Sequence, residues 1–225
     1  RTFRYAGHDS VIAECEASLR RLGTDYIDVL QLHWPDPTTP IHETMEAFAT
    51  LVNQGKVRAV GVSNYSVAQM AEAELTVGIV SNQVPYSMVN RGIEADVIPY
   101  CLEHGKAVLA YSPLQRGLLT GKFSPDHTFA PTDHRGRNEY FTPENIRRVN
   151  GFLGTLRDLA EDHDATLAQL VIAWTLAQPG ITAALVGARD AEQALANARG
   201  GEIQLDPAEV ELINKRLGSL VLEGV

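Results

Sequence analysis

Hydrophobic positions along the chain fall into short apolar runs and longer stretches with helical spacing, and the two kinds of segment alternate. The apolar runs predict strands at residues 27–33, 57–64, 79–83, 107–114 and 182–186. The helical spacing predicts helices at residues 10–22, 41–54, 66–75, 93–104, 144–163, 167–177, 190–198 and 207–217. Because helices follow strands throughout, we expect a parallel sheet with right-handed crossovers.

Each predicted strand ends in polar residues at its carboxyl end, which is where parallel α/β folds bind ligands. An open doubly wound sheet carries a glycine-rich turn after its first strand, but here the buried strand at 27–33 runs into Trp34 and Pro35. A (β/α)8 barrel is therefore favoured. A barrel needs eight strands, whereas five are visible and the chain opens with a helix. We therefore expect about the first three β/α units to be absent from this chain, or supplied elsewhere.

Two segment boundaries have local signals. Asp9 or Ser10 can cap the first helix, and Asp206 followed by Pro207 suits the start of the last helix. Residues 115–143 form a long segment rich in Gly, Pro, Asp, Arg and His, which predicts a functional lid or a disordered loop. Arg135 and Arg137 are interpreted as part of a solvated basic loop.

Composition limits the kinds of partner. The formal net charge of −9 disfavours nucleic acid or an anionic membrane, although a local basic site for a phosphorylated small molecule stays open. Apolar runs are shorter than the ~18 residues of a membrane span, and a signal peptide is not visible. Cys15 and Cys101 read as reduced structural thiols, so we expect a cytoplasmic protein.

Metal binding is not predicted. Four potential ligands lie in the long loop, namely Asp126, His127, Asp133 and His134. Their spacing does not match a metal-ligand pattern, so they are interpreted as solvated loop residues.

The motifs together resemble the aldo-keto reductase family over essentially all 225 positions. The similar stretches are LRRLGTDYIDVLQLHWPDP (19–37), GKVRAVGVSNYS (55–66), SNQVPYSMVNR (81–91), AYSPLQRGLLTGKF (110–123) and ALVGARDAEQALANA (184–198). The similarity is greatest to the bacterial type with GAR near the C-terminus, related to the potassium-channel β-subunit branch. The resemblance implies a (β/α)8 barrel that transfers hydride from NADPH to an aldehyde or ketone.

The resemblance implies that His33 is the catalytic histidine and holds the substrate's carbonyl oxygen by a hydrogen bond. The family's Tyr, Lys and Asp lie on early strands that we expect this chain to lack, and Tyr5, Tyr26 and Lys56 do not match their contexts. Trp34 is assigned equally to the wall of the substrate pocket or to packing under the following loop.

The nicotinamide end of the cofactor is assigned to three strand-end residues and one ring. Ser63, Asn64 and Gln83 offer the donors and acceptors that a carboxamide needs. Taken alone, Ser63 and Asn64 are better explained as turn-forming residues, but Gln83 in register on the next strand favours the cofactor role. Tyr111 is expected to stack on the nicotinamide ring, with a core tyrosine as the alternative.

The phosphate end is assigned to two segments. The first resembles the family's pyrophosphate loop and comprises Ser112, Pro113, Leu114, Arg116, Gly117 and Lys122. The second comprises Gly187, Arg189, Gln193 and Asn197, the last three of which share one face of a predicted helix. Since arginine suits bidentate phosphate binding, Arg189 is expected to contact a 2′-phosphate, which implies NADP(H). A polar solvent face is the alternative.

These observations predict a single domain over residues 1–225, equivalent to strands 4–8 of the barrel and their helices. The protein is expected to be an NADPH-dependent aldo-keto reductase acting on a small carbonyl substrate, with this chain alone inactive. The alternative is a non-catalytic NADP(H)-binding or regulatory module. A homo-oligomer or an N-terminal completing segment is left open as a partner.

Overall fold

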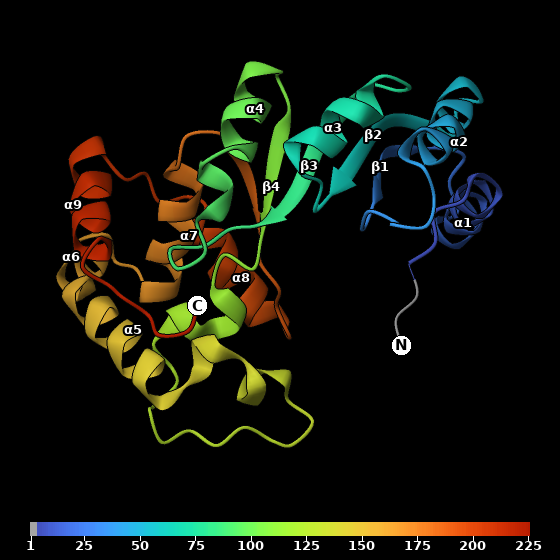
Figure 1. Cartoon of the computed structure of the whole chain (residues 1–225). Helices are drawn as coiled ribbons and strands as arrows, with labels where there is room; N and C mark the ends of the chain where they lie inside the picture. The colour runs from blue at the N-terminus through green and yellow to red at the C-terminus, as the bar shows by residue number, and fades with distance from the viewer. Residues whose placement is uncertain (1–3) are drawn as a thin grey trace. The chain divides into compact units, whose positions relative to one another are not determined.

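The computed structural model describes residues 4–225 and contains a five-stranded sheet in the order β1-β2-β3-β4-β5. The chain divides into two compact units, and the colours of Figure 1 follow the residue number from the N-terminus to the C-terminus. Unit 1 consists of the residues up to Pro85 together with Gly92–Leu109, and unit 2 consists of Tyr86–Arg91 and Ala110–Val225. The strand β4 (Ala107–Tyr111) belongs to both, so the single-domain assignment stays a prediction.

Unit 1 alternates helices with strands, as the sequence predicts. Its elements are α1 (His8–Leu22), β1 (Ile27–Leu32), α2 (Ile41–Asn53), β2 (Val57–Ser63), α3 (Val67–Glu74), β3 (Ile79–Pro85), the short 3-10 helix η1 (Gly92–Glu94), α4 (Val97–Glu103) and the start of β4. Strands β1 and β2 pair in parallel, and so do β2 and β3, which confirms the predicted parallel sheet.

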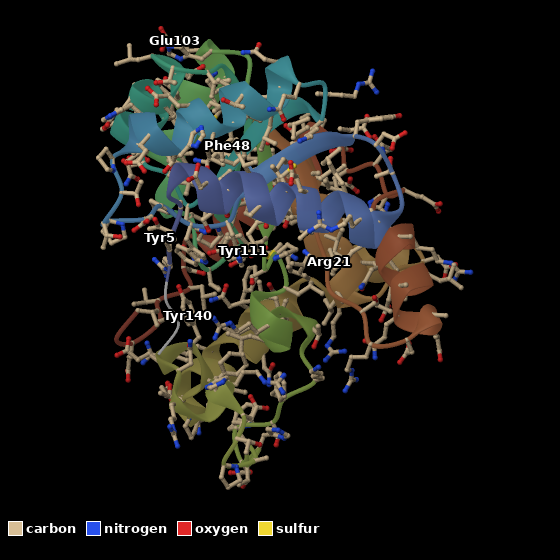
Figure 2. The ribbon with its side chains drawn as sticks, turned by 90° about the vertical axis from the view of Figure 1, so that its right-hand side faces the viewer. Tyr5, Arg21, Phe48, Glu103, Tyr111 and Tyr140 are labelled. Atoms are coloured by element: carbon tan, nitrogen blue, oxygen red, sulfur yellow. The ribbon has the colours of Figure 1, made fainter. Side chains whose placement is uncertain are left out.

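The core of unit 1 lies between its helices and the sheet. Phe48 of α2, labelled in Figure 2, is 2% exposed. Cys15 and Cys101 are both free thiols in buried positions. Burial raises the pKa of each thiol, as expected for inert structural cysteines.

β1 differs from the sequence prediction of a buried strand. Val29 is 44% exposed, and the other residues of the strand are half-buried or exposed. An apolar run shows that a strand can be covered on both faces, but whether it is covered depends on what packs against it.

Unit 2 is mainly helical. Its elements are the 3-10 helices η2 (Gln115–Thr120), η3 (His134–Arg137) and η4 (Glu139–Phe141), then α5 (Pro143–Thr155), α6 (Arg157–Asp162), α7 (Leu167–Ala177), β5 (Ile181–Leu185), α8 (Ala191–Gly200) and α9 (Pro207–Leu217). Trp174 of α7 is the largest fully buried side chain, and its ring stacks on Tyr86 at 5.9 Å between centroids. Its indole N–H donates to Asn214 Oδ1 at 3.0 Å.

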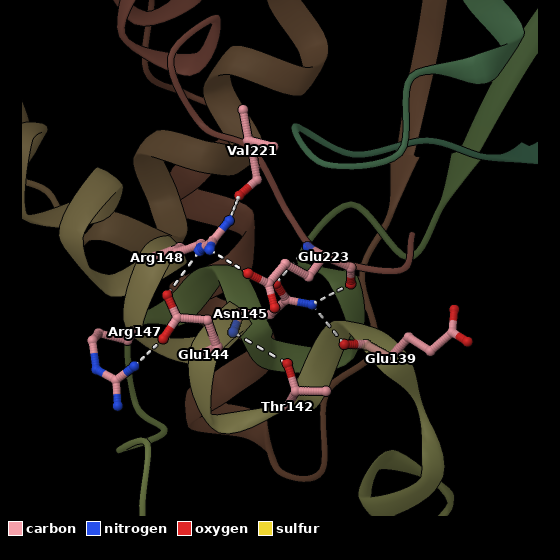
Figure 3. A network of polar contacts seen from close by, with 8 residues as sticks. All are labelled: Glu139, Thr142, Glu144, Asn145, Arg147, Arg148, Val221 and Glu223. Atoms are coloured by element: carbon pink, nitrogen blue, oxygen red, sulfur yellow. Dashed lines mark hydrogen bonds and ion pairs between the residues drawn. The ribbon is translucent and has the colours of Figure 1, made fainter.

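The last residues of the chain bind to α5 through the polar network in Figure 3. The buried Asn145 side chain donates to the carbonyls of Glu139 and Glu223 and accepts from the Glu223 N–H at 2.9 Å. Arg148 donates to the Val221 carbonyl at 2.8 Å and pairs with Glu144. These bonds hold residues 221–223 against the helix.

Three helix predictions are wrong in detail. α1 begins at His8 with Gly7 as its N-cap, so neither Asp9 nor Ser10 caps it. The segment predicted as one helix at 93–104 is divided, because the Asp96 side chain accepts the Val97 N–H and starts α4 afresh. The helix predicted at 144–163 is divided at Leu156, between α5 and α6. The predicted cap at Asp206 is confirmed.

The long segment at 115–143 is ordered by an aromatic cluster within unit 2. Phe123 and Phe129 lie 5.3 Å apart, and both contact the ring of Phe141 edge-on. The Arg135 guanidinium lies over Phe123 and Phe129, at 5.3 and 5.4 Å from the ring centroids. Burial of these rings explains why the loop folds on itself.

Among residues 4–225, none of the helices combines the length and the apolar character needed to cross a lipid bilayer.

Candidate functional site

In unit 1, the carboxyl ends of β2 and β3 are joined by side-chain and backbone hydrogen bonds. Register places Ser63 opposite Gln83. The Ser63 hydroxyl donates to the Gln83 carbonyl at 2.8 Å, and the Asn64 backbone N–H donates to the same oxygen at 2.9 Å. The sequence prediction that these three residues meet at one sheet edge is therefore supported by the geometry, while their role with a cofactor stays a prediction.

Asn64 holds a strained backbone position at this edge. Its φ of 60° lies in the left-handed region, which asparagine tolerates better than most residues. Its side-chain amide donates to Ser63 Oγ at 2.9 Å and to the His33 carbonyl at 3.3 Å. The end of β1 is thereby tied to the end of β2. Strain of this kind gathers at functional sites.

A second layer of polar side chains lies in the same sheet, two residues before Ser63 on β2 and two residues before Gln83 on β3. Gln31 of β1 and Ser81 of β3 flank Gly61 of β2 in register. The Gln31 amide donates to Ser81 Oγ at 3.2 Å, and Gln83 Nε2 donates to Gln31 Oε1 at 2.8 Å. Neither Gln31 nor Ser81 was predicted as a site residue, because an isolated Gln or Ser in a strand has no motif.

His33 is exposed just after the end of β1, with its ring 6.2 Å from that of Trp34. The Arg4 guanidinium lies over the Trp34 ring at 4.0 Å from its centroid. Trp34 is half-buried, which fits both interpretations of this residue.

The turn after β1 is fixed by the buried carboxylate of Asp36. It accepts hydrogen bonds from the N–H of Ala6 and Thr38 and from the hydroxyls of Thr38 and Thr39. Burial acts to raise the pKa of this carboxyl, but the four hydrogen bonds outweigh it and hold the pKa well below its ordinary value.

In unit 2, a pocket of about 1050 Å³ collects the other predicted cofactor residues. The eleven that line it are Tyr111, Ser112, Pro113, Leu114, Arg116, Gly117, Lys122, Gly187, Arg189, Gln193 and Asn197. Residues separated by up to 86 positions in the sequence thus face one cavity. Burial raises the pKa of the Tyr111 hydroxyl, so this ring is neutral at physiological pH.

The floor of this pocket is a tight turn. Ser112, Gln115 and Arg116 all have positive φ, and Gly117 follows at φ 92°. The φ of Gly117 favours glycine, and a Cβ there would lie 3.1 Å from Cε and Nζ at the flexible end of the Lys122 side chain. The backbone is shaped as in sites where amide groups approach a phosphate.

Positive charge accumulates in the pocket. The pKa of Lys122 is lowered, first by burial and then by the neighbouring charges of Arg135 and Arg189. Because Arg135 and Arg189 disfavour the charged form of Lys122, an anion bound among these side chains would relieve the repulsion. The donor set therefore fits a phosphorylated ligand.

The far wall is α8. The Asp190 carboxylate caps this helix by accepting the Gln193 N–H at 2.8 Å, and Gln193 Oε1 accepts the Arg189 N–H at 3.2 Å. Asn197 donates to the Gly187 carbonyl at 3.3 Å. Because a carboxylate already occupies this helix end, attraction for a phosphate has to come from the Arg189 and Lys122 side chains.

The interpretation of Arg135 as a solvated loop residue is wrong, whereas His127 is exposed as predicted. Arg135 and His127 both line the pocket. The Arg135 guanidinium is half-buried, pairs with Asp133 at 2.6 Å and donates to the Arg116 carbonyl at 3.3 Å. The flanking phenylalanines could have signalled a folded loop. Arg137 is exposed, as predicted.

The residues excluded from catalysis also have structural roles. Lys56 pairs with Glu16 of α1 at 2.6 Å, and the Arg58 guanidinium lies over the ring of Tyr26. Among residues 4–225, groups of three or more His, Cys, Asp or Glu side chains suited to a metal ion are not found.

The parallel sheet with helices after its strands is an α/β fold, and the pocket of unit 2 has side chains suited to a phosphorylated small molecule. The sequence matches the aldo/keto reductase family over residues 5–217, so the chain belongs to that family. The resemblance found in the motifs is confirmed.

Similar proteins come from several bacteria. The aldo-keto reductase YhdN of Bacillus subtilis is 39% identical over 83% of this chain and 57% of its own length. The NADH-specific methylglyoxal reductase of Escherichia coli is 34% identical over 94% of this chain and 65% of its own length. The solved structure of the glycerol dehydrogenase AKR11B4 from Gluconobacter oxydans superposes with a TM-score of 0.94 at 34% identity, covering 100% of this chain and 68% of that one.

The chain therefore spans 57 to 65% of the length of these two curated relatives. The matches run along nearly the whole of this chain and give no support to the expectation that three β/α units are absent from it.

Proposed function

We propose that this chain is part of an NADPH-dependent oxidoreductase that reduces an aldehyde or ketone to an alcohol. The observation that carries the proposal is that one pocket is lined by eleven residues that the sequence predicts as dinucleotide contacts. The size of the pocket, about 1050 Å³, suits a large ligand rather than an isolated anion.

Each group of residues has a proposed task. Ser63, Asn64 and Gln83 hold the carboxamide of the nicotinamide, and Tyr111 lies against the ring. The η2 turn with Lys122 holds the pyrophosphate. The bound cofactor supplies the hydride, and His33 donates a hydrogen bond that orients and polarises the substrate's carbonyl oxygen.

The preference for NADPH is proposed from Arg189. This exposed guanidinium lines the pocket beside Gln193, where it can pair with a 2′-phosphate through two parallel hydrogen bonds. The names of relatives leave this choice open, since the Escherichia coli enzyme is described as NADH-specific.

The variant R189Q tests the choice of cofactor. Loss of a charge-assisted phosphate contact is expected to weaken NADPH binding about tenfold or more while changing NADH binding less than about twofold. Calorimetric titration of the 225-residue chain measures both constants. R137Q, which removes an exposed arginine outside the pocket, is the matched control and should change neither. Equal losses for NADPH and NADH in R189Q would refute the 2′-phosphate assignment.

Turnover is tested separately, by following NADPH oxidation with nitrobenzaldehyde on the protein expressed from its complete gene. Consumption that falls by about 10²-fold or more in H33Q supports a reductase with His33 at the carbonyl. The alternative is a non-catalytic NADP(H)-binding module, which the sequence prediction that this chain lacks the family's Tyr, Lys and Asp would favour. Tight NADPH binding without turnover would favour that alternative.

A further inference from the structure

The polar layer below the strand ends of unit 1 consists of Gln31, Gly61 and Ser81. Alternation along each strand places Gly61 on the same face as Ser63, and Ser81 on the same face as Gln83. Ser81 is 3% exposed, and Gln31 is half-buried. Amide and hydroxyl groups in such positions need partners, and here they are each other's partners.

The hydrogen bonds in this layer run in one direction. Gln83 Nε2 donates to Gln31 Oε1 at 2.8 Å, and Gln31 Nε2 donates to Ser81 Oγ at 3.2 Å. With one N–H committed to Gln31, the Gln83 side chain keeps its second N–H and both lone pairs of Oε1 for other partners.

Space for this arrangement comes from Gly61. A Cβ at this position would lie 2.6 Å from Ser81 Oγ and 2.7 Å from Gln31 Cγ, distances that real Cβ atoms do not show. The φ of Gly61 is not in the left-handed region, so the glycine is needed here for room and not for backbone conformation.

We propose that Gln31 is a positioning residue that sets which end of the Gln83 amide faces the ligand. The proposal rests on the proposed function, in which Gln83 meets a carboxamide. With its Nε2 held by Gln31, Gln83 presents Oε1 as an acceptor. The site then selects a ligand that donates an N–H, as a pyridine carboxamide does, over a pyridine ketone of the same shape.

The experiment compares NADP⁺ with its 3-acetylpyridine analogue, in which a methyl group replaces the carboxamide NH₂. Both dissociation constants are measured calorimetrically on the 225-residue chain. The unaltered chain is expected to prefer NADP⁺ by about fivefold, the range of one hydrogen bond. Q31L removes the acceptor that holds Gln83 Nε2, and the preference should fall below about twofold.

Two variants separate orientation from general damage. Q31E keeps an oxygen that accepts from Gln83 Nε2 and should retain the preference. In G61A the added Cβ pushes the Gln31 side chain out of its place beside Gly61, so this variant should lose the preference for NADP⁺. The proposal can therefore be tested even if Q31L does not fold. Q54L removes an exposed glutamine at the end of α2 and should behave as the unaltered chain.

If the role of Gln31 were purely structural, Q31L would weaken the binding of both dinucleotides equally, and the ratio of their dissociation constants would not change. An unchanged ratio in Q31L, or a loss in Q31E as large as in Q31L, would therefore overturn the proposal while the proposed function stands. If the unaltered chain binds neither dinucleotide, the proposed function itself is overturned, and this proposal with it.

Discussion

At the scale of single residues, the Asp36 carboxylate stabilises the turn that follows β1 through four hydrogen bonds. One 7% exposed carboxylate satisfies two backbone N–H groups and two hydroxyls, and it connects Ala6 to the turn that follows β1. Removing such an acceptor leaves several donors without a partner, which costs more than the hydrogen bonds themselves.

We expect D36N to lower the free energy of unfolding by about 2–3 kcal/mol at pH 7. The folded-state pKa of Asp36 lies below the unfolded value of about 3.9, so its contribution is fully present above that pH. It should be lost as the pH falls below about 4, where the difference between D36N and the unaltered chain shrinks.

Urea unfolding followed between pH 3 and 7 measures this difference. The control is D28N, because Asp28 forms only an exposed pair with Arg58 and should cost less than about 1 kcal/mol. A difference that grows toward acid pH would contradict the assignment.

The sequence predicts candidate site residues that belong to a motif. It does not predict residues whose role depends on a contact with a distant part of the chain. Arg116 and Arg189 belong to recognisable stretches, and the structure brings both to one pocket. Gln31 carries no local signal, and the phenylalanines around Arg135 indicate a folded loop but not its contact with Arg116. Gln31 matters because it contacts Gln83, 52 residues away, and Arg135 matters because it donates to the Arg116 carbonyl, 19 residues away. Contacts of this range depend on the register of a folded sheet and on loop packing.

At the scale of elements, the close approach of α7 and α8 positions one wall of the pocket. Gln169 of α7 donates to the Ala196 carbonyl of α8 at 2.9 Å. At the end of α8, a Cβ on Gly200 would lie 3.1 Å from the backbone of Gln169. Absence of a side chain at this point lets the two helices touch.

We expect G200A to lower the free energy of unfolding by about 1–3 kcal/mol, because the added methyl meets backbone that has no room to move. G151A is the matched control. It lies inside α5, where a Cβ would meet nothing within 4 Å among residues 4–225, and it should stabilise the chain by about 0.5–1 kcal/mol. Thermal unfolding of both variants checks this, and shifts of the same sign would contradict it.

Helix and strand types were largely predictable, whereas their ends were not. α9 begins and ends where the sequence places it, because Asp206 and Pro207 are strong starting signals. The break between α5 and α6 has no such signal. It falls at Leu156, which is 0% exposed, so the backbone bends there to bury a side chain.

At the scale of the whole molecule, charge is unevenly distributed. The chain carries a formal net charge of −9, yet its large pocket is lined by Arg116, Lys122, Arg135 and Arg189. In a protein with this net charge, four cations at one pocket make the local potential more favourable to an anion than the average surface is.

We expect NADPH affinity to fall about tenfold when NaCl is raised from about 0.05 to 0.5 M, because added salt screens the cations of the pocket. Lys122→Gln should show a shallower dependence on salt. Fluorescence titration of NADPH measures both slopes. Affinity that is independent of salt would contradict an electrostatic pocket.

Fold class was within reach of the sequence, because strands and helices alternate along it and each strand ends in polar residues. The division into two compact units could not be predicted from the sequence, because it depends on how densely distant segments contact one another. The chain passes between the units after Pro85, after Arg91 and after Leu109, and the last of these points lies inside the apolar run of β4.

The chain's two tryptophans fall one in each unit, and their surroundings differ. In unit 1 the Trp34 ring lies against the Arg4 guanidinium. In unit 2 Trp174 is 0% exposed and its indole N–H is hydrogen-bonded to Asn214. Replacing either indole by phenylalanine would leave a single tryptophan, which can be excited at longer wavelengths than the seven tyrosines. Emission spectra would then report on each half of the chain by itself, without an added dye.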